Sequence, residues 1–371
     1  MNDKIGVEMP GSKVAVIGAG AMGAATAWQL TARGHDVVVF EQFERLHDRG
    51  SSHGSARVFR LAYPTAPWVQ FAIEALTLWR DLEEDAGVSL LDQFGALDHG
   101  IPACTQSISD TLSAAGVSHE VLSQDAAQER FPGMKIDGQA VFHPQGGGVN
   151  ATATVNSLLT VAESRGADFR EREPVEHLTI NSDSVVVHTA NGSAEFDRVV
   201  VTAGSWVQKL IGASVDIGST VVTQEQPATF QPTIDADWPA FIHYAPGPPK
   251  TNTLIDPVSH YGLPTPEGGF KIGEHHTGII VDPDQRPDDA DPARLARLQE
   301  HVQEWFPGLD SASAAVETCL YTTTPSTDFI IEAHGPVIVG GGFSGHGFKF
   351  VPRVGAALAD LVEGKPAPRF H

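Results

Sequence analysis

The pattern of apolar and glycine positions near the N-terminus predicts a strand, a tight turn, a helix and a second strand. Residues 13–17 form a short apolar run, 18–23 contain three glycines, and 24–33 have the composition of a helix. Gly34 ends this helix, and residues 36–41 return as an apolar strand. This order of elements is typical of a βαβ unit in a parallel sheet.

Two later segments repeat the alternation of strand and helix. The run Val185-Val186-Val187 is followed by Asn191-Gly192, a strong hairpin turn signal, and then by a strand over 198–202. The run 337–339 leads into glycines and then into a helix that ends at about residue 363. Because these elements lie far apart in the sequence, they predict one parallel sheet that is assembled from dispersed segments.

The composition indicates a globular protein whose overall field repels anions. The chain has 371 residues, of which 41% are hydrophobic and 19% charged, and its formal net charge is −22. This length suits two domains that share a ligand. The negative field disfavours nucleic acid and anionic membrane surfaces as partners, so an anionic substrate would need a local basic pocket.

The chain has only two cysteines, Cys104 and Cys319. Two cysteines are too few for a disulfide framework or for a four-cysteine zinc site. Cys104 is interpreted as a small buried apolar residue. The N-terminal residues lack the apolar core of a secretory signal, and no apolar run approaches the ~20 residues of a membrane helix. We therefore expect a cytoplasmic protein without a membrane partner, either a monomer or a small homo-oligomer.

The first turn carries the pattern Gly18-x-Gly20-x-x-Gly23, and Glu41 ends the next strand. Glycines at this spacing let the backbone approach a pyrophosphate at a helix N-terminus, while the acidic side chain accepts from ribose hydroxyls. Glu41 favours a free 2′-hydroxyl, which means FAD or NAD rather than NADP. The alternative is a glycine-rich turn in an ordinary βαβ unit.

A small polar loop, 50–56, is followed by two arginines, Arg57 and Arg60. On a helical turn, a spacing of three would place both guanidinium groups on one face. The alternative is that both are solvated surface residues.

Beyond these motifs, the chain resembles the monomeric sarcosine oxidase and N-methyltryptophan oxidase family, whose members are FAD-dependent amine oxidoreductases of the D-amino acid oxidase-like superfamily. The resemblance spans nearly the whole chain and rests on five motifs. They are the loop 50–60, the strand and turn Val199–Trp206, the strand Lys271–His275, the segment Cys319–Pro325 and the glycine-rich turn Gly342–Lys349. The last two of these motifs are the most specific.

The resemblance implies an α/β fold in which a Rossmann-like FAD-binding domain (1–90, 145–230 and 319–371) is interrupted by a second, α+β substrate domain (91–144 and 231–318). It also implies that Cys319 forms a thioether to the flavin methyl, a bond that a thiolate could make. The implied FAD-binding residues are Gly18, Gly20, Met22, Gly23, Glu41, Ser51, Ser52, His53, Arg57, Val175, Ala203, Gly204, Trp206, Cys319, Gly345, Gly347, Phe348 and Lys349.

The same resemblance assigns substrate and catalytic roles. Arg60 and Lys349 would hold the substrate carboxylate, since two cations in a dry pocket orient an amino acid. Lys271 and Arg57 would lie against the flavin ring, where a fixed cation stabilises the charge that develops on oxygen. The remaining pocket residues are His275 and Tyr321, both catalytic, and Tyr261, which binds substrate.

These features predict an FAD-dependent oxidase of a small secondary amino acid that uses O₂ and produces H₂O₂. The histidines at 275 and 276, with Glu274, lack a convincing metal-ligand spacing, so no metal is expected. The segment between His243 and His260 is long and polar, which leaves the size of the N-substituent open. The alternatives are a fructosyl amino acid or cyclic imino acid (pipecolate) oxidase, a flavin-binding module without turnover, and an NAD-dependent dehydrogenase.

Overall fold

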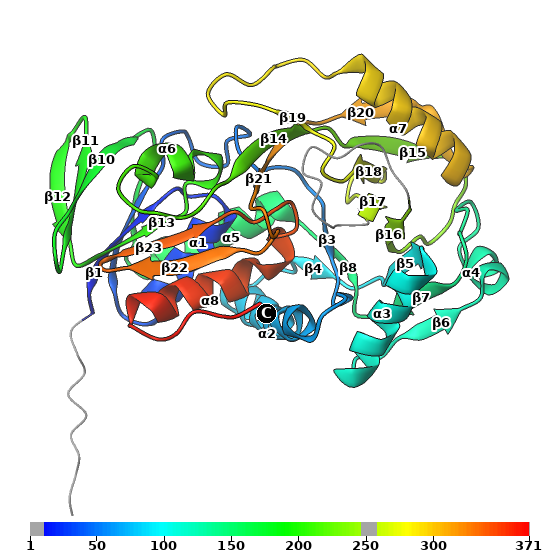
Figure 1. Cartoon of the computed structure of the whole chain (residues 1–371), viewed down its shortest axis with the longest axis horizontal. Coiled ribbons are helices and arrows are strands. Elements are labelled where there is room, and N and C mark those ends of the chain that lie inside the picture. Colours follow the sequence, from blue (N-terminus) through cyan, green and yellow to red (C-terminus); the bar gives the residue numbers. More distant parts are fainter. Residues whose placement is uncertain (1–10, 246–257, 371) are drawn as a thin grey trace, which may run out of the picture.

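The computed structural model describes residues 11–245 and 258–370, and two large sheets organise this part of the chain (Figure 1). The first is a six-stranded sheet whose strands run parallel, except for the hairpin at one edge. Its spatial order is β22 (Ile330–His334), β23 (Val337–Gly341), β13 (Arg198–Val201), β1 (Lys13–Ile17), β2 (Asp36–Phe40) and β9 (Asp168–Arg170).

Both faces of this sheet are covered, because successive strand residues point to opposite sides. Val14 and Val16 pack with the helices α1 (Ala21–Ala32), α5 (Ala151–Ser164) and α8 (Val351–Val362). Ala15 and Ile17 pack instead with an antiparallel meander on the other face. The meander consists of β10 (Val175–Ile180), β11 (Val185–Thr189) and β12 (Gly192–Phe196).

The second large sheet is mixed and has eight strands. One face packs on α7 (Pro292–Trp305) and α4 (Gln124–Arg130) through an apolar cluster that includes Leu97, Phe241, Ile272 and Leu298. The spatial order is β20 (Leu309–Val316), β15 (Ala228–Pro232), β18 (Phe270–Glu274), β17 (Val258–Pro264), β16 (Ala240–Tyr244), β5 (Ala96–Gly100), β7 (Ala140–His143) and β6 (Glu120–Leu122).

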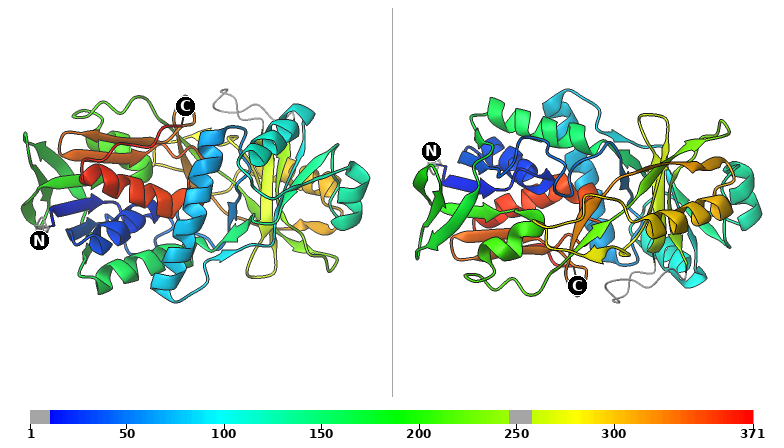
Figure 2. Two further views of the ribbon diagram at one scale, coloured as in Figure 1. Left: turned by 90° about the horizontal axis from the view of Figure 1, so that it is seen from below. Right: turned by 90° about the horizontal axis from the view of Figure 1, so that it is seen from above.

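Smaller elements connect the two large sheets. Figure 2 shows α2 (Ala66–Ala86), in light blue, crossing the molecule between them. One three-stranded sheet joins β3 (Arg57–Phe59), β8 (Gly147–Val149) and β4 (Leu91–Asp92), and another joins β19 (Ile279–Ile280), β14 (Val221–Glu225) and β21 (Cys319–Thr323). The remaining helices are α3 (Pro102–Ala114) and α6 (Val207–Ile211). No helix among the described residues is long and apolar enough to cross a membrane.

The α/β class, the first βαβ unit, the 191–192 hairpin and the C-terminal helix are confirmed. Arg57 and Arg60 do not lie on a helical turn, because Arg57–Phe59 is a strand paired with β8. The segments 91–144 and 231–318, which the resemblance assigns to the second domain, supply most of the eight-stranded sheet. The domain boundaries remain a prediction.

Candidate active site

A single cavity of about 980 Å³ brings together segments from all parts of the described chain. This volume is at the upper end of the range for small-molecule and cofactor sites. Every residue expected to bind cofactor or substrate lines the cavity, with the exception of Gly23. The sequence motifs, of which the first and the last are more than 300 residues apart, therefore converge on one site.

One end of the cavity is formed by the turn between β1 and α1. A Cβ at Gly23 would lie 1.8 Å from the carbonyl oxygen of Gly18, so a side chain at this position would push α1 away from the turn. A Cβ at Gly20 would instead meet only the hydroxyl of Ser52. Gly23 thus permits close helix–strand packing, while Gly20 leaves the backbone open toward the cavity, as a pyrophosphate requires.

The carboxylate of Glu41 is buried beside this turn. It accepts hydrogen bonds from the backbone N–H groups of Ala19 (2.8 Å) and Phe43 (3.0 Å). Burial by itself would raise the pKa of Glu41, but these bonds and the neighbouring His47 outweigh it, so the pKa lies below its ordinary value. Glu41 is therefore an ionised acceptor that lines the cavity, which fits it to hold ribose hydroxyls.

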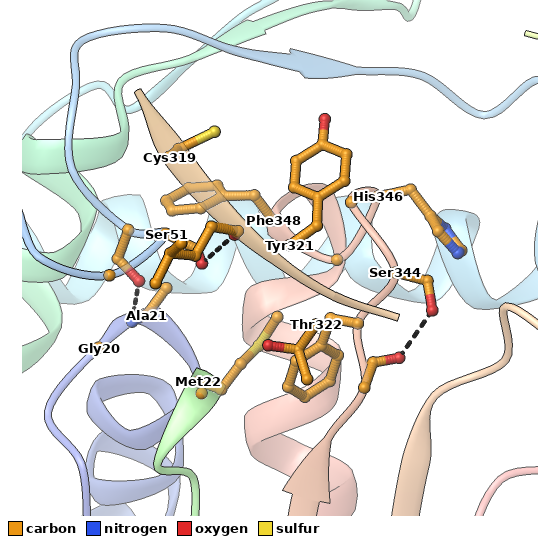
Figure 3. Close-up of a pocket in the computed structure, with 18 of the residues that line it drawn as sticks. Gly20, Ala21, Met22, Ser51, Cys319, Tyr321, Thr322, Ser344, His346 and Phe348 are labelled. Carbon is orange, nitrogen blue, oxygen red and sulfur yellow. Dashed lines mark hydrogen bonds between the residues drawn. The ribbon is translucent and has the colours of Figure 1, made fainter. Parts of the chain in front are cut away.

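The polar loop at 51–57 is fastened to β21 across the middle of the cavity. The hydroxyl of Ser51 donates to the carbonyl of Leu320, and a ring nitrogen of His53 lies 3.0 Å from the carbonyl of Thr318. Figure 3 shows Cys319 and Tyr321 on one side of β21 and Thr322 on the other. The loop and the strand thus place the Cys319 sulfur within the cavity wall.

The Cys319 thiol is not activated in the protein alone. Burial raises its pKa, and the positive charges of Arg57 and Lys271 oppose that rise only in part. Cys104, interpreted from the sequence as a buried apolar residue, is only half-buried and lines the same cavity. The two cysteines are therefore both exposed to whatever the cavity binds.

Two cations lie at the centre of the site. Arg57 donates to the backbone carbonyls of Ser51 (3.0 Å) and His53 (2.6 Å), which fixes its guanidinium group. Lys271, on β18, is buried and forms an ion pair with Glu317. Burial, followed by the charge of Arg57, lowers the pKa of Lys271, and Glu317 opposes that effect. The Lys271 ammonium therefore has a carboxylate partner inside the protein.

Arg60 follows β3 and meets the second sheet. One of its guanidinium nitrogens donates to Asp98 Oδ1 (3.1 Å) and to the hydroxyl of Tyr244 (3.0 Å), and Tyr244 also donates to Asp98. Asp98 is fully buried, and burial raises its pKa to about 6 although Arg60 and Tyr244 favour the charged form. Arg60 is thus held in the cavity wall by an internal carboxylate.

Lys349 lies near Arg60, although it is far away in sequence. Both cations approach the ring of Tyr63, at 4.6 Å for the Arg60 guanidinium carbon and 5.7 Å for Lys349 Nζ. Lys349 is buried, and its ammonium donates to the carbonyl of His346 (2.8 Å). The predicted pair of substrate-binding cations therefore flanks one aromatic ring within the cavity.

An aromatic group completes this end of the site. The hydroxyls of Tyr261 and Tyr321 are hydrogen-bonded to each other, and burial raises the pKa of both. The ring of His275 lies 6.1 Å from Tyr261 and 5.7 Å from Tyr321. Gly345 has φ of +73°, and a Cβ there would lie 2.2 Å from the Tyr321 ring, so only glycine fits against this group.

Sequence reasoning missed Asp98, Tyr244 and Glu317. One feature of the sequence could have indicated Asp98. It is an acidic residue inside the short strand Ala96–Gly100, where a buried charge needs a partner. No local pattern reveals Glu317, because its partner Lys271 lies 46 residues away. Residues 246–257, which make up most of the polar segment between His243 and His260, lie outside the described residues.

Comparison with known proteins identifies the family of the chain. The model of the FAD dependent oxidoreductase family matches residues 13–361. The monomeric sarcosine oxidase of Bacillus sp. (strain NS-129) is 31% identical over 94% of this chain and 92% of its own length. The N-methyl-L-tryptophan oxidase of Yersinia pestis is 27% identical over 95% of both chains.

Among solved structures, the chain is similar to the open form of NikD, an unusual amino acid oxidase essential for nikkomycin biosynthesis. The TM-score is 0.83 and the identity 26%, covering 97% of this chain and 98% of the other. The likeness extends over nearly the full length of both chains. It therefore includes both large sheets.

Proposed function

We propose that this chain, which belongs to the FAD dependent oxidoreductase family, is an oxidase of a small secondary amino acid of the sarcosine or N-methyl amino acid type. In this reaction the substrate C–N bond is oxidised to an imine that water hydrolyses, and O₂ is reduced to H₂O₂. The observation that carries the proposal is the single cavity, which joins a dinucleotide-binding turn to a pair of buried cations, Arg60 and Lys349.

Different residues of the cavity would bind the cofactor and the substrate. FAD, when bound, supplies the two-electron acceptor. Gly20, Glu41 and the loop at 51–57 would hold its nucleotide and ring portions. Arg60 and Lys349 would bind the substrate carboxylate and so orient the C–H bond beside nitrogen. Lys271 would place a positive charge where O₂ is reduced.

A peroxide assay on the purified yellow protein tests this function. The panel comprises sarcosine, other N-methyl amino acids, fructosyl-glycine, fructosyl-valine and pipecolate. We expect H₂O₂ from sarcosine or another N-methyl amino acid. Turnover of the fructosyl substrates alone would assign the protein to the fructosyl amino acid oxidases, and pipecolate alone to the cyclic imino acid oxidases. A flavoprotein that releases no peroxide with any of them would be a binding module.

We predict that FAD is attached covalently through Cys319. After acid precipitation, the yellow chromophore should remain with the wild-type protein and should leave Cys319→Ser. Because the pKa of the thiol is raised and the thiolate is the nucleophile, attachment to FAD-free protein should become faster as pH increases. Cys104→Ser, which alters the other cysteine of the cavity, is the matched control and should keep its flavin. Recovery of wild-type FAD in the supernatant would exclude the linkage.

We predict that Lys349→Met lowers kcat/KM by roughly thirtyfold to several-thousandfold. Losing one partner of a buried charge pair costs on the order of 2–5 kcal/mol. The variant should also lose its preference for an amino acid over the matching amine that lacks a carboxylate. The exposed lysine variant Lys365→Met should retain both properties. A preference that survives Lys349→Met would remove this residue from the carboxylate site.

We predict that a carboxylate ligand binds more weakly as pH rises above about 6. A ligand carboxylate beside Arg60 adds negative charge near Asp98, which favours the protonated form of Asp98, whose pKa is about 6. Binding therefore takes up a proton, and affinity should fall by at most about tenfold per pH unit. Acetate affinity between pH 5.5 and 8, followed by the change in flavin absorbance, measures this effect. Asp98→Asn should abolish the slope, and an unchanged slope would contradict the assignment.

We predict that Lys271→Met slows reoxidation of the reduced enzyme by O₂ about 10²–10³-fold and affects anaerobic reduction by substrate much less. Removing one fixed charge from a site of developing negative charge has an effect of this size. Stopped-flow absorbance at the oxidised flavin band separates the two steps. Glu317→Gln, which leaves the Lys271 charge in place, should not slow reoxidation. Arg57 lies at the same centre, so a double variant with Lys271 should show the larger effect. A collapse of reduction with normal reoxidation would instead place Lys271 in the substrate pocket.

A further inference from the structure

Histidines form a row on the face of the eight-stranded sheet that points away from the cavity. His99 on β5 lies directly opposite His243 on β16, and His243 lies opposite His260 on β17. His260 in turn faces Glu274 on β18. Because strand residues alternate, the intervening Tyr261 points to the cavity, which it lines, and the row belongs to the opposite face.

Helix α7 covers this row and adds a fourth histidine to it. Arg297 and His301 are one helical turn apart and share a face. Arg297 donates two hydrogen bonds to Glu274 (2.7 and 2.6 Å), and the His301 ring stacks on His260 with 3.4 Å between centroids. As a result, His243, His260 and His301 each offer a ligand atom within 4.8 Å of the other two.

We propose that His243, His260 and His301 form a binding site for one divalent transition-metal ion of the Zn²⁺ type. Imidazole nitrogen is a ligand that Zn²⁺ prefers, and three histidines plus a water are a common ligand set for this ion. Nε2 of His301 is buried and has no hydrogen-bond partner among the described residues. A buried polar atom in this state is unfavourable unless something binds it, which a metal ion would do.

The electrostatic environment agrees with a cation ligand. Asp137 and Glu304 add negative potential at His243. Among the nearby cations, Arg297 is paired with Glu274 and Lys135 lies over the Trp305 ring.

Binding the ion requires the histidine side chains to rearrange. Tetrahedral Zn²⁺ with bonds of about 2.0–2.1 Å places its ligand nitrogens about 3.3 Å apart, so each pair must approach by at most about 1.5 Å. The near-parallel rings of His260 and His301 (8°) must also splay, because a bound ion lies close to the plane of each ligating ring. Glu274 Oε1 lies 3.9 Å from His260 Nε2, which is beyond hydrogen-bond distance, so this carboxylate adds negative potential at the ring without orienting it.

A metal ion at this site would stabilise the folded protein and would not take part in the reaction. Its ligands come from two adjacent strands and from α7, so a bound ion would cross-link the helix to the sheet. Tyr261 lies on the other face of β17, and Lys271 lies on the cavity face of the neighbouring strand β18. We therefore expect metal removal to lower thermal stability and to leave the cavity residues in place.

The test uses tag-free flavin-loaded enzyme that has been treated with a chelator and dialysed. Zn²⁺ is titrated in competition with a chromogenic indicator, and Co²⁺ is added separately to obtain a visible spectrum. We expect one Zn²⁺ per chain, the intense visible bands of tetrahedral Co²⁺ and a Tm that rises with Zn²⁺ concentration. His301→Asn should weaken Zn²⁺ binding by about 100-fold or more and abolish the Co²⁺ bands.

The control is His177→Asn, which alters an exposed histidine stacked on His188 and should leave all three readouts unchanged. Absence of stoichiometric Zn²⁺ binding by the wild-type enzyme would overturn the proposal, as would octahedral Co²⁺ bands. Binding that is lost in His177→Asn and kept in His301→Asn would also overturn it, since the ion would then lie on the meander. Far-UV circular dichroism and flavin content establish whether each variant is folded. If His301→Asn does not fold, the Co²⁺ spectrum of the wild-type enzyme decides whether the tetrahedral site exists.

Discussion

The buried pair of Arg60 and Asp98 is the contact on which the arrangement of the cavity depends. Arg60 follows β3, which pairs with β8 next to the nucleotide-binding half, and Asp98 belongs to β5 in the eight-stranded sheet. Removing one partner of such a pair leaves an uncompensated buried charge and typically costs about 3–5 kcal/mol. The pair therefore holds the two halves together and also positions the Arg60 guanidinium group in the cavity wall.

The same contact bears on how this acidic protein would bind the carboxylate substrate that we propose. The chain carries a net charge of −22, which repels carboxylates at long range. The cavity wall, however, includes Arg57, Arg60, Lys271 and Lys349. Glu317 pairs with Lys271 and Asp98 pairs with Arg60, which reduces the cost of burying these two cations. Local pairing therefore outweighs the global field at short distance.

The sequence predicted those parts of the molecule in which the signal is local. The first βαβ unit and the Asn191-Gly192 hairpin follow from residues within one turn of each other, and both are confirmed. The helix start was placed at residue 24, while the structure begins it at Ala21, because the glycine-rich turn hides the first helical residues. The eight-stranded sheet was missed, since its neighbours β5 and β16 are about 140 residues apart and their pairing leaves no local pattern.

The alternation of residues along the strands also accounts for why one sheet can carry two kinds of chemistry. Lys271 faces the cavity and Glu274 faces α7, yet both lie on β18. Helix α7 is in turn connected to the cavity wall: Arg294 donates to the carbonyl of Gln224 (2.9 Å), and the next residue, Glu225, is paired in register with Cys319. A contact that holds α7 against the face of the sheet opposite the cavity therefore also restrains β14 and, through it, β21, the strand that carries Cys319. The position of this thiol consequently depends on packing that begins on the opposite side of the sheet.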